Sequence, residues 1–151
     1  MGERSAEHAT FRIERVYPAR PKRVYEAWTN SKMKARWFGP TDQKSAISLD
    51  YRIGGREHFT GEAPNGMVFS YDAIFHEIVP DQRIVYSYTM DVDTVRISAS
   101  LVTMEITASG DDGARLHLTE QGVYLDGADI PANREQGNHD MLEALATALS
   151  D

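Results

Sequence analysis

The C-terminal residues, 130–151, carry the clearest pattern of apolar and polar positions in the chain. Apolar side chains recur there at the i, i+3, i+4, i+7 spacing of a helix that packs on a sheet. These side chains are Met141, Leu142, Leu145, Ala148 and Leu149. One turn earlier the same stripe carries Gly137 and Asn138, with Arg134 above them. The pattern predicts one helix whose buried face becomes small and polar toward its N-terminal end, as in a helix that closes a cavity.

A strand and two short helices are predicted before the central region. Residues 11–17 alternate between apolar and polar side chains, as in a strand with one apolar face, and Pro18 ends this strand. Pro21 suits the first turn of a helix, and Asn30 or Ser31 can cap a second short helix.

The central region, residues 44–121, predicts an antiparallel meander, because turn signals recur about every ten to fifteen residues between β-branched and aromatic segments. The turns are Gly54-Gly55, Pro64-Asn65-Gly66, Pro80-Asp81, residues 91–94 and residues 110–113. Residues 95–108 change their apolar parity midway, which predicts a bulge near Leu101. With the first strand, the six central strands predict an α+β fold in which a seven-stranded antiparallel sheet wraps around the C-terminal helix.

The composition fits a single domain and excludes several classes of function. A chain of 151 residues, 41% of them hydrophobic, suits one core. We expect a flexible N-terminus over residues 1–9 and one domain over residues 10–151. The net charge of −7 argues against nucleic-acid binding, and the basic residues within 20–36 are expected on a solvated helix face. The absence of cysteine excludes disulfides and thiolate chemistry.

No segment has the pattern of a targeting or membrane-spanning sequence. Residues 1–10 are polar and lack the apolar core of a signal peptide, and no apolar run is longer than a strand. We therefore expect a soluble, cytoplasmic protein, monomeric or homodimeric, without nucleic-acid or membrane partners.

Short motifs run through nearly the whole chain. They are residues 14–21 (ERVYPARP), 26–29 (EAWT), 36–40 (RWFGP), 52–56 (RIGGR), 75–80 (FHEIVP), 83–85 (RIV), 116–120 (LHLTE) and the pair Gln136-Gly137. These motifs resemble the homologues of the heat-shock protein 90 ATPase activator C-terminal domain, which belong to the START-like SRPBCC superfamily. The resemblance implies the helix-grip fold, also seen in the birch pollen allergen, with a hydrophobic cavity between the sheet and the last helix.

The chief departure from the family pattern is Asn138, where the family usually places Trp after the helix glycine. The loss of an indole predicts a larger or wetter cavity mouth. A buried amide without partners costs about 1–3 kcal/mol. Asn138 is therefore either a hydrogen-bonding group for a ligand or an amide satisfied by a neighbouring strand or by water.

Arg15 and Glu120 lie on the apolar parities of the first and last strands, which are sheet neighbours in the helix-grip fold. They form either a structural ion pair at the cavity rim or a binding site for a polar head group. A paired carboxylate stays ionised, whereas an isolated buried one can serve as a general acid or base.

The histidines do not predict a metal site. His117 and Glu120 face opposite sides of a strand, and Glu135 and His139 share the outer face of the last helix. A catalytic zinc site needs about three protein ligands, and no third is apparent. The sequence also lacks a G-x-S-x-G elbow, a phosphate-binding loop and a dinucleotide fingerprint, so we assign no catalytic residue, no metal and no cofactor.

Aromatic residues of the central strands can either stack on a flat ligand or form plain core; they are Phe59, Phe69, Tyr71, Phe75, Tyr86 and Tyr88. Trp28 and Trp37 are predicted to form the core of the helix pair. The leading interpretation is a non-enzymatic binding protein for a small hydrophobic or aromatic molecule. The predicted ligand-binding residues are Phe69, Tyr71, Tyr86, Tyr88, Met104, Leu118, Met141 and Leu145 as apolar walls, with Glu120, Arg134 and Asn138 as polar anchors.

Two alternatives stand beside this interpretation. The first is a chaperone-interacting domain, which predicts a surface for a large protein partner. The second is an enzyme of the cyclase or hydrolase type, which needs Glu120 or a histidine in the cavity without an ionic partner.

Overall fold

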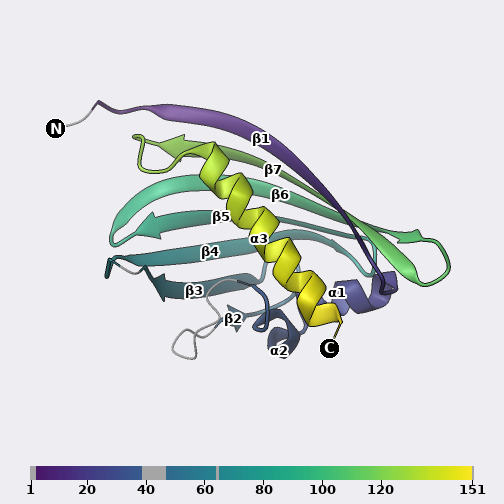
Figure 1. Cartoon of the computed structure of the whole chain (residues 1–151). Helices are drawn as coiled ribbons and strands as arrows, with labels where there is room; N and C mark the ends of the chain where they lie inside the picture. The colour runs from purple at the N-terminus through teal and green to yellow at the C-terminus, as the bar shows by residue number, and fades with distance from the viewer. Residues whose placement is uncertain (1–2, 39–46, 64, 151) are drawn as a thin grey trace.

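The structure, a computed structural model, describes residues 3–38, 47–63 and 65–150. One antiparallel sheet and one long helix contain most of these residues. The strands are β1 (Ala6–Tyr17), β2 (Ser48–Leu49), β3 (Arg56–Glu62), β4 (Val68–Val79), β5 (Arg83–Val92), β6 (Val95–Ser109) and β7 (Gly113–Leu125). The helices are α1 (Pro21–Thr29), α2 (Ser31–Lys34) and α3 (Pro131–Leu149). The strand order is β1-β7-β6-β5-β4-β3-β2, and α3 lies across one face of the sheet (Figure 1).

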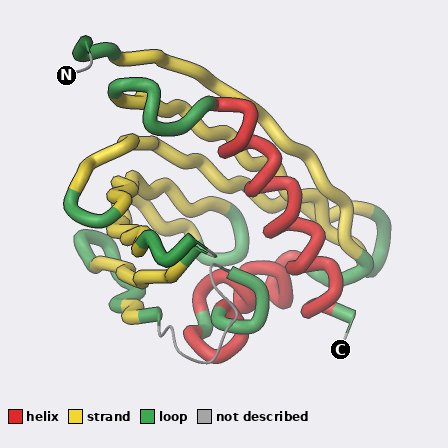
Figure 2. The backbone as a smooth tube through the Cα atoms, turned by 60° about the vertical axis from the view of Figure 1, so that its left-hand side comes forward, coloured by secondary structure: helices red, strands yellow, loops and turns green. Residues whose placement is uncertain are grey.

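The sheet curls around α3, while α1 and α2 lie together at one end of it (Figure 2). Leu142 and Leu145 of α3 are fully buried against the inward faces of the strands, and Leu149 is buried near the C-terminal end. The Tyr17 hydroxyl at the end of β1 donates a hydrogen bond to the carbonyl oxygen of Leu142 at 2.9 Å. The predicted α+β helix-grip arrangement is therefore confirmed.

The first strand begins earlier than the sequence predicts. β1 starts at Ala6, which pairs with Leu125 of β7, so residues 6–9 of the expected N-terminal extension belong to the sheet. Arg4 also forms an ion pair with Asp126 at 2.9 Å. β7 extends far enough to pair with residues 6–9, and this pairing lengthens β1 toward the N-terminus. Among the described residues, no helix is long and apolar enough to cross a membrane.

The helix boundaries after β1 follow the predicted signals. α1 begins at Pro21. The Asn30 side chain accepts hydrogen bonds from the backbone N–H groups of Lys32 at 3.0 Å and Met33 at 3.1 Å, so Asn30 is the N-cap of α2.

Trp28 and Trp37 form the core between the two short helices, as predicted. Their ring centroids lie 4.8 Å apart in an edge-to-face arrangement, and the Trp37 indole N–H donates to the carbonyl oxygen of Ala27 at 3.0 Å. Gly39 and Pro40 of the adjoining motif lie outside the described residues, as does Pro64 of the predicted turn.

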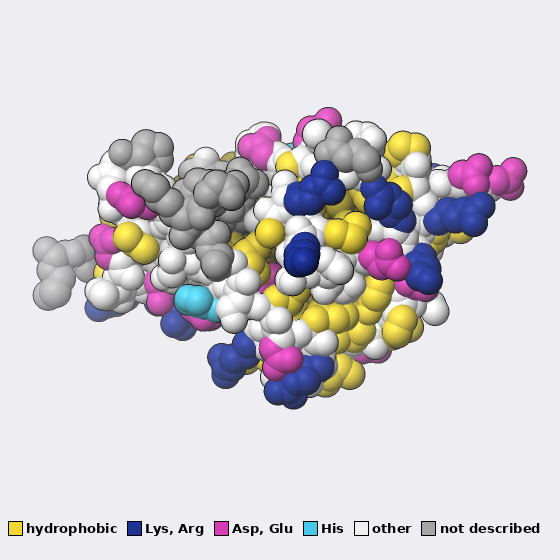
Figure 3. Space-filling view, turned by 90° about the horizontal axis from the view of Figure 1, so that it is seen from below, with side chains coloured by type: hydrophobic (Ala, Val, Ile, Leu, Met, Phe, Trp, Pro, Cys, Tyr) yellow, Lys and Arg dark blue, Asp and Glu magenta, His cyan; other side chains and the backbone are white. Residues whose placement is uncertain are grey.

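The basic residues of the helix pair are mostly exposed, in agreement with a solvated face. Figure 3 views the molecule from the side where α1 and α2 lie, and its Lys and Arg side chains are spread out, with acidic side chains beside several of them. Lys34 departs from the prediction, because its side chain is buried under α2.

The predicted bulge in β6 lies at a different position. The pairing of β5 with β6 slips between Met90 and Asp91, which leaves Ile97 as the extra residue. Leu101, where the sequence predicted the bulge, is exposed on the outer face instead. Because a slip of one residue exchanges the two faces of a strand, Ser98 points into the protein.

Candidate functional site

A cavity of about 180 Å³ lies between the sheet and α3. Its lining combines aromatic side chains from the strands with polar and small residues from α3: Phe38, Phe59, Tyr71, Tyr86, Tyr88, Met90, Glu120, Arg134, Gly137, Asn138 and Met141. Among these residues Gly137 is exposed, and a Cβ atom at its position would meet nothing within 4 Å. The mouth of the cavity therefore lies beside Gly137.

The aromatic wall is built by the inward parity of β3, β4 and β5. The rings of Phe59 and Tyr71, which are paired across β3 and β4, stack with centroids 4.7 Å apart. Tyr88 of β5 lies 4.9 Å from Tyr71, and Phe38 closes the group edge-on at 5.5 Å from Tyr71. These rings pack on one another, as plain core would, and they also line the cavity.

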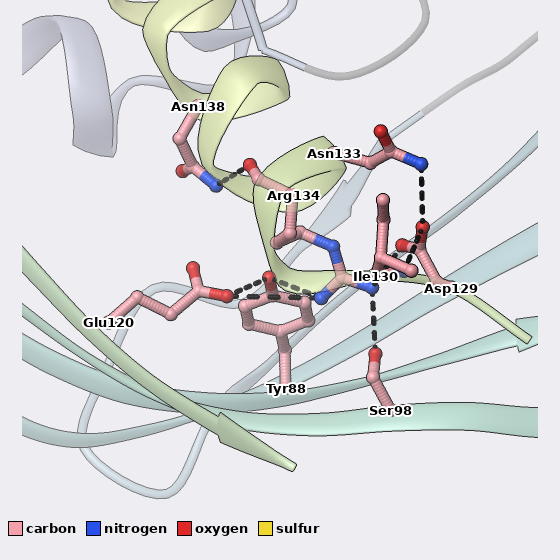
Figure 4. Close-up of polar contacts among 8 residues, drawn as sticks. All are labelled: Tyr88, Ser98, Glu120, Asp129, Ile130, Asn133, Arg134 and Asn138. Atoms are coloured by element: carbon pink, nitrogen blue, oxygen red, sulfur yellow. Dashed lines mark hydrogen bonds and ion pairs between the residues drawn. The ribbon is translucent and has the colours of Figure 1, made fainter. Parts of the chain in front are cut away.

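The polar end of the cavity is a hydrogen-bonded chain that joins three strands to α3 (Figure 4). The Tyr88 hydroxyl donates to Oε2 of Glu120 at 2.7 Å. Arg134 donates from Nη1 to the Tyr88 hydroxyl at 2.9 Å and from Nη2 to the Ser98 hydroxyl at 2.8 Å. Its guanidinium also lies 5.3 Å from the centre of the Tyr124 ring. These contacts fix the Arg134 side chain in one place over the sheet.

Burial dominates the electrostatics of Glu120. Its side chain is only 1% exposed, and the loss of solvent raises the pKa of the carboxyl group above its usual range. The hydrogen bond from Tyr88 and the charge of Arg134, 3.8 Å from Oε2, lower that pKa and offset part of the effect. Burial likewise raises the pKa of the Tyr88 hydroxyl, which therefore stays protonated and acts as a donor.

Asn138 is satisfied by its own helix. Its Nδ2 donates to the backbone carbonyl oxygen of Arg134 at 2.9 Å, one turn earlier in α3. Because only the NH₂ group can donate to a carbonyl, this bond fixes the orientation of the amide and directs Oδ1 away from the helix. The sequence offered a strand, water or a ligand as partners, and the partner found is the backbone of α3.

The predicted pair of Arg15 and Glu120 is wrong. Glu120 stands opposite Phe11 in the register of β1 and β7, whereas Arg15 stands opposite Leu116, four residues away along each strand. Arg15 instead forms an ion pair with Glu143 of α3 at 2.7 Å. The cation that approaches Glu120 comes from α3 and is Arg134.

The structure brings most of the predicted ligand-binding residues to the cavity; these are Tyr71, Tyr86, Tyr88, Glu120, Arg134, Asn138 and Met141. Met104, Leu118 and Leu145 do not line it, because they are fully buried in the surrounding core. Phe69 is half-buried against Phe59 and also lies outside the lining. Their prediction as cavity walls is wrong.

Four lining residues were absent from the predicted set: Phe38, Phe59, Met90 and Gly137. Met90 shares the inward parity of Tyr86 and Tyr88, and this shared parity is the sequence signal for its place in the wall. Phe38 follows α2, and no sequence signal places the end of a short helix against a distant strand.

Among the described residues, no group of three or more His, Asp or Glu side chains is placed to hold a metal ion. Glu135 and His139 lie 3.8 Å apart on the outer side of α3, as their spacing predicts.

A wider hollow of about 570 Å³ lies on the outer face of the sheet, where β1, β7 and β6 contribute residues such as Ala9, Ala99 and Gly122. Strands alone line it, whereas the cavity under α3 has walls from both the sheet and the helix. Ligand sites bury most of the ligand surface. The cavity under α3 is therefore the stronger candidate.

The sheet, the enclosing helix and the cavity between them define the class of protein, a helix-grip member of the START-like SRPBCC superfamily. A family model described as "Activator of Hsp90 ATPase homolog 1-like protein" matches residues 18–150, and the chain belongs to this family. Proteins of this fold commonly bind hydrophobic ligands.

Solved structures of similar proteins agree with this assignment. A protein from Rhizobium leguminosarum is 39% identical over 98% of both chains, with a TM-score of 0.93. A protein from Rhizobium loti is 45% identical over 95% of this chain and 99% of the other, with a TM-score of 0.89. A protein from Chromobacterium violaceum is 26% identical over 94% of this chain and 97% of the other, with a TM-score of 0.76. No curated protein matches the chain.

Proposed function

We propose that this protein binds a small hydrophobic or aromatic molecule in the cavity between the sheet and α3, without catalysing a reaction on it. The observation that carries the proposal is the make-up of the cavity wall, in which stacked rings such as Tyr71 and Tyr88 face a short polar cluster around Glu120. Ligand sites are typically concave and mostly apolar, with a few placed polar groups.

The contacts of Glu120 favour binding over catalysis. A general acid or base in this cavity would need a carboxylate that is not engaged by a cation. Glu120 instead accepts a hydrogen bond from Tyr88 at 2.7 Å and lies 3.8 Å from the guanidinium of Arg134. These contacts suit a carboxyl group that anchors a bound ligand.

Titration of ¹⁵N-labelled protein with toluene, followed by amide chemical shifts, tests the proposal. We expect saturable shift changes at cavity residues, with the largest at Tyr71, Tyr88, Asn138 and Met141. Changes confined to the outer face of the sheet would overturn the proposal, as would the absence of any change with toluene and with its hydroxylated analogue p-cresol up to their solubility limits.

Two neighbouring positions of α3 provide a blocking variant and its control. Gly137→Leu places a branched side chain at the cavity mouth, so we expect weaker toluene binding. Gln136→Leu introduces the same side chain one residue earlier, at an exposed position that does not line the cavity, and binding should be retained.

A further inference from the structure

The volume of the cavity limits the size of its ligand. An engineered protein cavity of about 150 Å³ accommodates benzene, and this cavity measures about 180 Å³. A single six-membered ring with one or two small substituents therefore fits, whereas a fused polycyclic molecule would have to displace core side chains. Displacement of close-packed side chains is costly, which favours a one-ring ligand.

The two donors nearest to Oε2 of Glu120 at the polar end of the cavity, Arg134 and Tyr88, are engaged by protein acceptors. Arg134 donates to Tyr88, Ser98 and Asp129, the last at 3.4 Å. The Tyr88 hydroxyl gives its one hydrogen to Glu120.

Two carbonyl-type oxygens remain toward the cavity, beside the hydroxyl group of Tyr86. The contacts of Tyr88 and Arg134 both fall on Oε2 of Glu120, and Oε1 points to the side where Asn138 lies (Figure 4). The Asn138 amide uses its NH₂ group on the backbone, so its oxygen is the atom left for other partners. These two oxygens can accept a hydrogen bond from a ligand that carries a hydroxyl group, and the Tyr86 hydroxyl can donate to the oxygen of the same group.

The charges around Arg134 disfavour an anionic ligand. Its guanidinium lies 3.8 Å from Glu120 and 3.4 Å from Asp129, so two carboxylates already face one cation. A ligand carboxylate would add a further negative charge in a region of low dielectric, where uncompensated charges are costly. The ligand is therefore uncharged at this end.

From these three constraints we infer that the ligand is a single-ring phenol, or a closely related one-ring alcohol, whose hydroxyl donates a hydrogen bond to Glu120. The ring then lies among the side chains of Phe59, Tyr71 and Tyr88. This inference rests on the proposed function, because it specifies the chemistry of the molecule held in the same cavity.

Three compounds of nearly equal shape test the inference: toluene, p-cresol and p-toluate. Their dissociation constants can be measured by calorimetry or by the amide shifts of ¹⁵N-labelled protein at neutral pH. We expect p-cresol to bind at least about tenfold more tightly than either of the others, because toluene cannot form the hydrogen bond to Glu120 and p-toluate brings a carboxylate toward Glu120 and Asp129. Equal or tighter binding of toluene or p-toluate overturns the inference and leaves the proposed function standing. If none of the three binds, both fail.

A matched pair of variants assigns the preference to Glu120. In Glu120→Gln the amide oxygen still accepts from Tyr88 and the NH₂ group faces the cavity, so the preference for p-cresol over toluene should shrink to less than about threefold. Glu105→Gln makes the same change on the exposed face of β6, and the preference should be unchanged. A full preference in Glu120→Gln, in protein whose chemical shifts show it to be folded, overturns the role of Glu120.

Discussion

The ammonium group of Lys34 lies 2.8 Å from Oε1 of Glu57, and the two side chains are 1% and 0% exposed. This buried ion pair joins α2 to β3. The Tyr71 hydroxyl points to the same oxygen at 3.5 Å, and Nζ of Lys34 lies 4.2 Å from the centre of the Phe38 ring. Because Tyr71 and Phe38 line the cavity, the pair holds the helical end of the molecule against the cavity wall.

Removal of one partner of this pair should be strongly destabilising. In Lys34→Met the Glu57 carboxylate is left buried without its cation, and we expect a loss of about 3–5 kcal/mol in the free energy of unfolding. Urea denaturation followed by tryptophan fluorescence measures this loss, since Trp28 and Trp37 lie in the same region.

Two further variants test the cause of that loss. Lys32→Met changes an exposed residue of the same helix and should alter stability by less than about 0.5 kcal/mol. Lys34→Met combined with Glu57→Leu should recover most of the stability, because apolar residues often replace a complete buried pair without loss. A loss below about 1 kcal/mol for Lys34→Met alone would mean that Glu57 gains solvent or another partner.

The second stability prediction concerns Leu145, which is fully buried in the middle of α3. Leu145→Ala should lower the free energy of unfolding by about 2–5 kcal/mol, the range for truncation of a buried leucine. Thr147→Ala at an exposed position of the same helix is the control and should be nearly neutral. A loss below about 1 kcal/mol for Leu145→Ala would contradict the packing of this helix face.

The elements of this fold could be predicted because local periodicity encodes them. The stripe around Leu145 has the period of a helix, and Pro21 and Asn30 mark helix starts through backbone chemistry alone. The inward parity that places Tyr88 and Glu120 follows in the same way from the two-residue period of a strand.

Contacts between distant elements could not be predicted in this way. The pairing of Lys34 with Glu57 depends on how α2 packs on β3, which no local pattern specifies. The inward orientation of Ser98 was not predicted, because the apolar side chains of Ile97 and Leu101 made the other parity of β6 look like the inward one. The bulge at Ile97 exchanges the two faces, and its position depends on pairing with β5.

Glu120 should give the protein a specific pH dependence. Because burial raises the pKa of this carboxyl group in the folded protein, the folded state holds the proton more tightly than the unfolded state does. Its contribution to the free energy of unfolding is then largest below the unfolded-state pKa of about 4.3, and it falls as pH rises through the folded-state pKa. Glu120→Gln removes this contribution.

We therefore expect the difference in free energy of unfolding, wild type minus Glu120→Gln, to decrease as pH is raised from about 4. Urea denaturation at a series of pH values measures it, and Glu105→Gln on the exposed face of β6 corrects for general charge effects. A difference that rises with pH would show that Arg134 and Tyr88 outweigh burial at this site.

The last prediction concerns Asn138, which is small for its place beside the cavity. Asn138→Trp should fill free space, so the stability should rise or stay level while toluene binding weakens. The lost bond from Nδ2 to the carbonyl of Arg134 matters little, because that carbonyl belongs to the regular turn of α3 and such back-bonds do not stabilise helices.

Denaturant unfolding and toluene titration measure the two effects, with Asn133→Trp at an exposed position of α3 as the control. Overpacking typically costs about 1–3 kcal/mol. A loss of that size with unchanged toluene binding would mean that the space beside Asn138 is already closed.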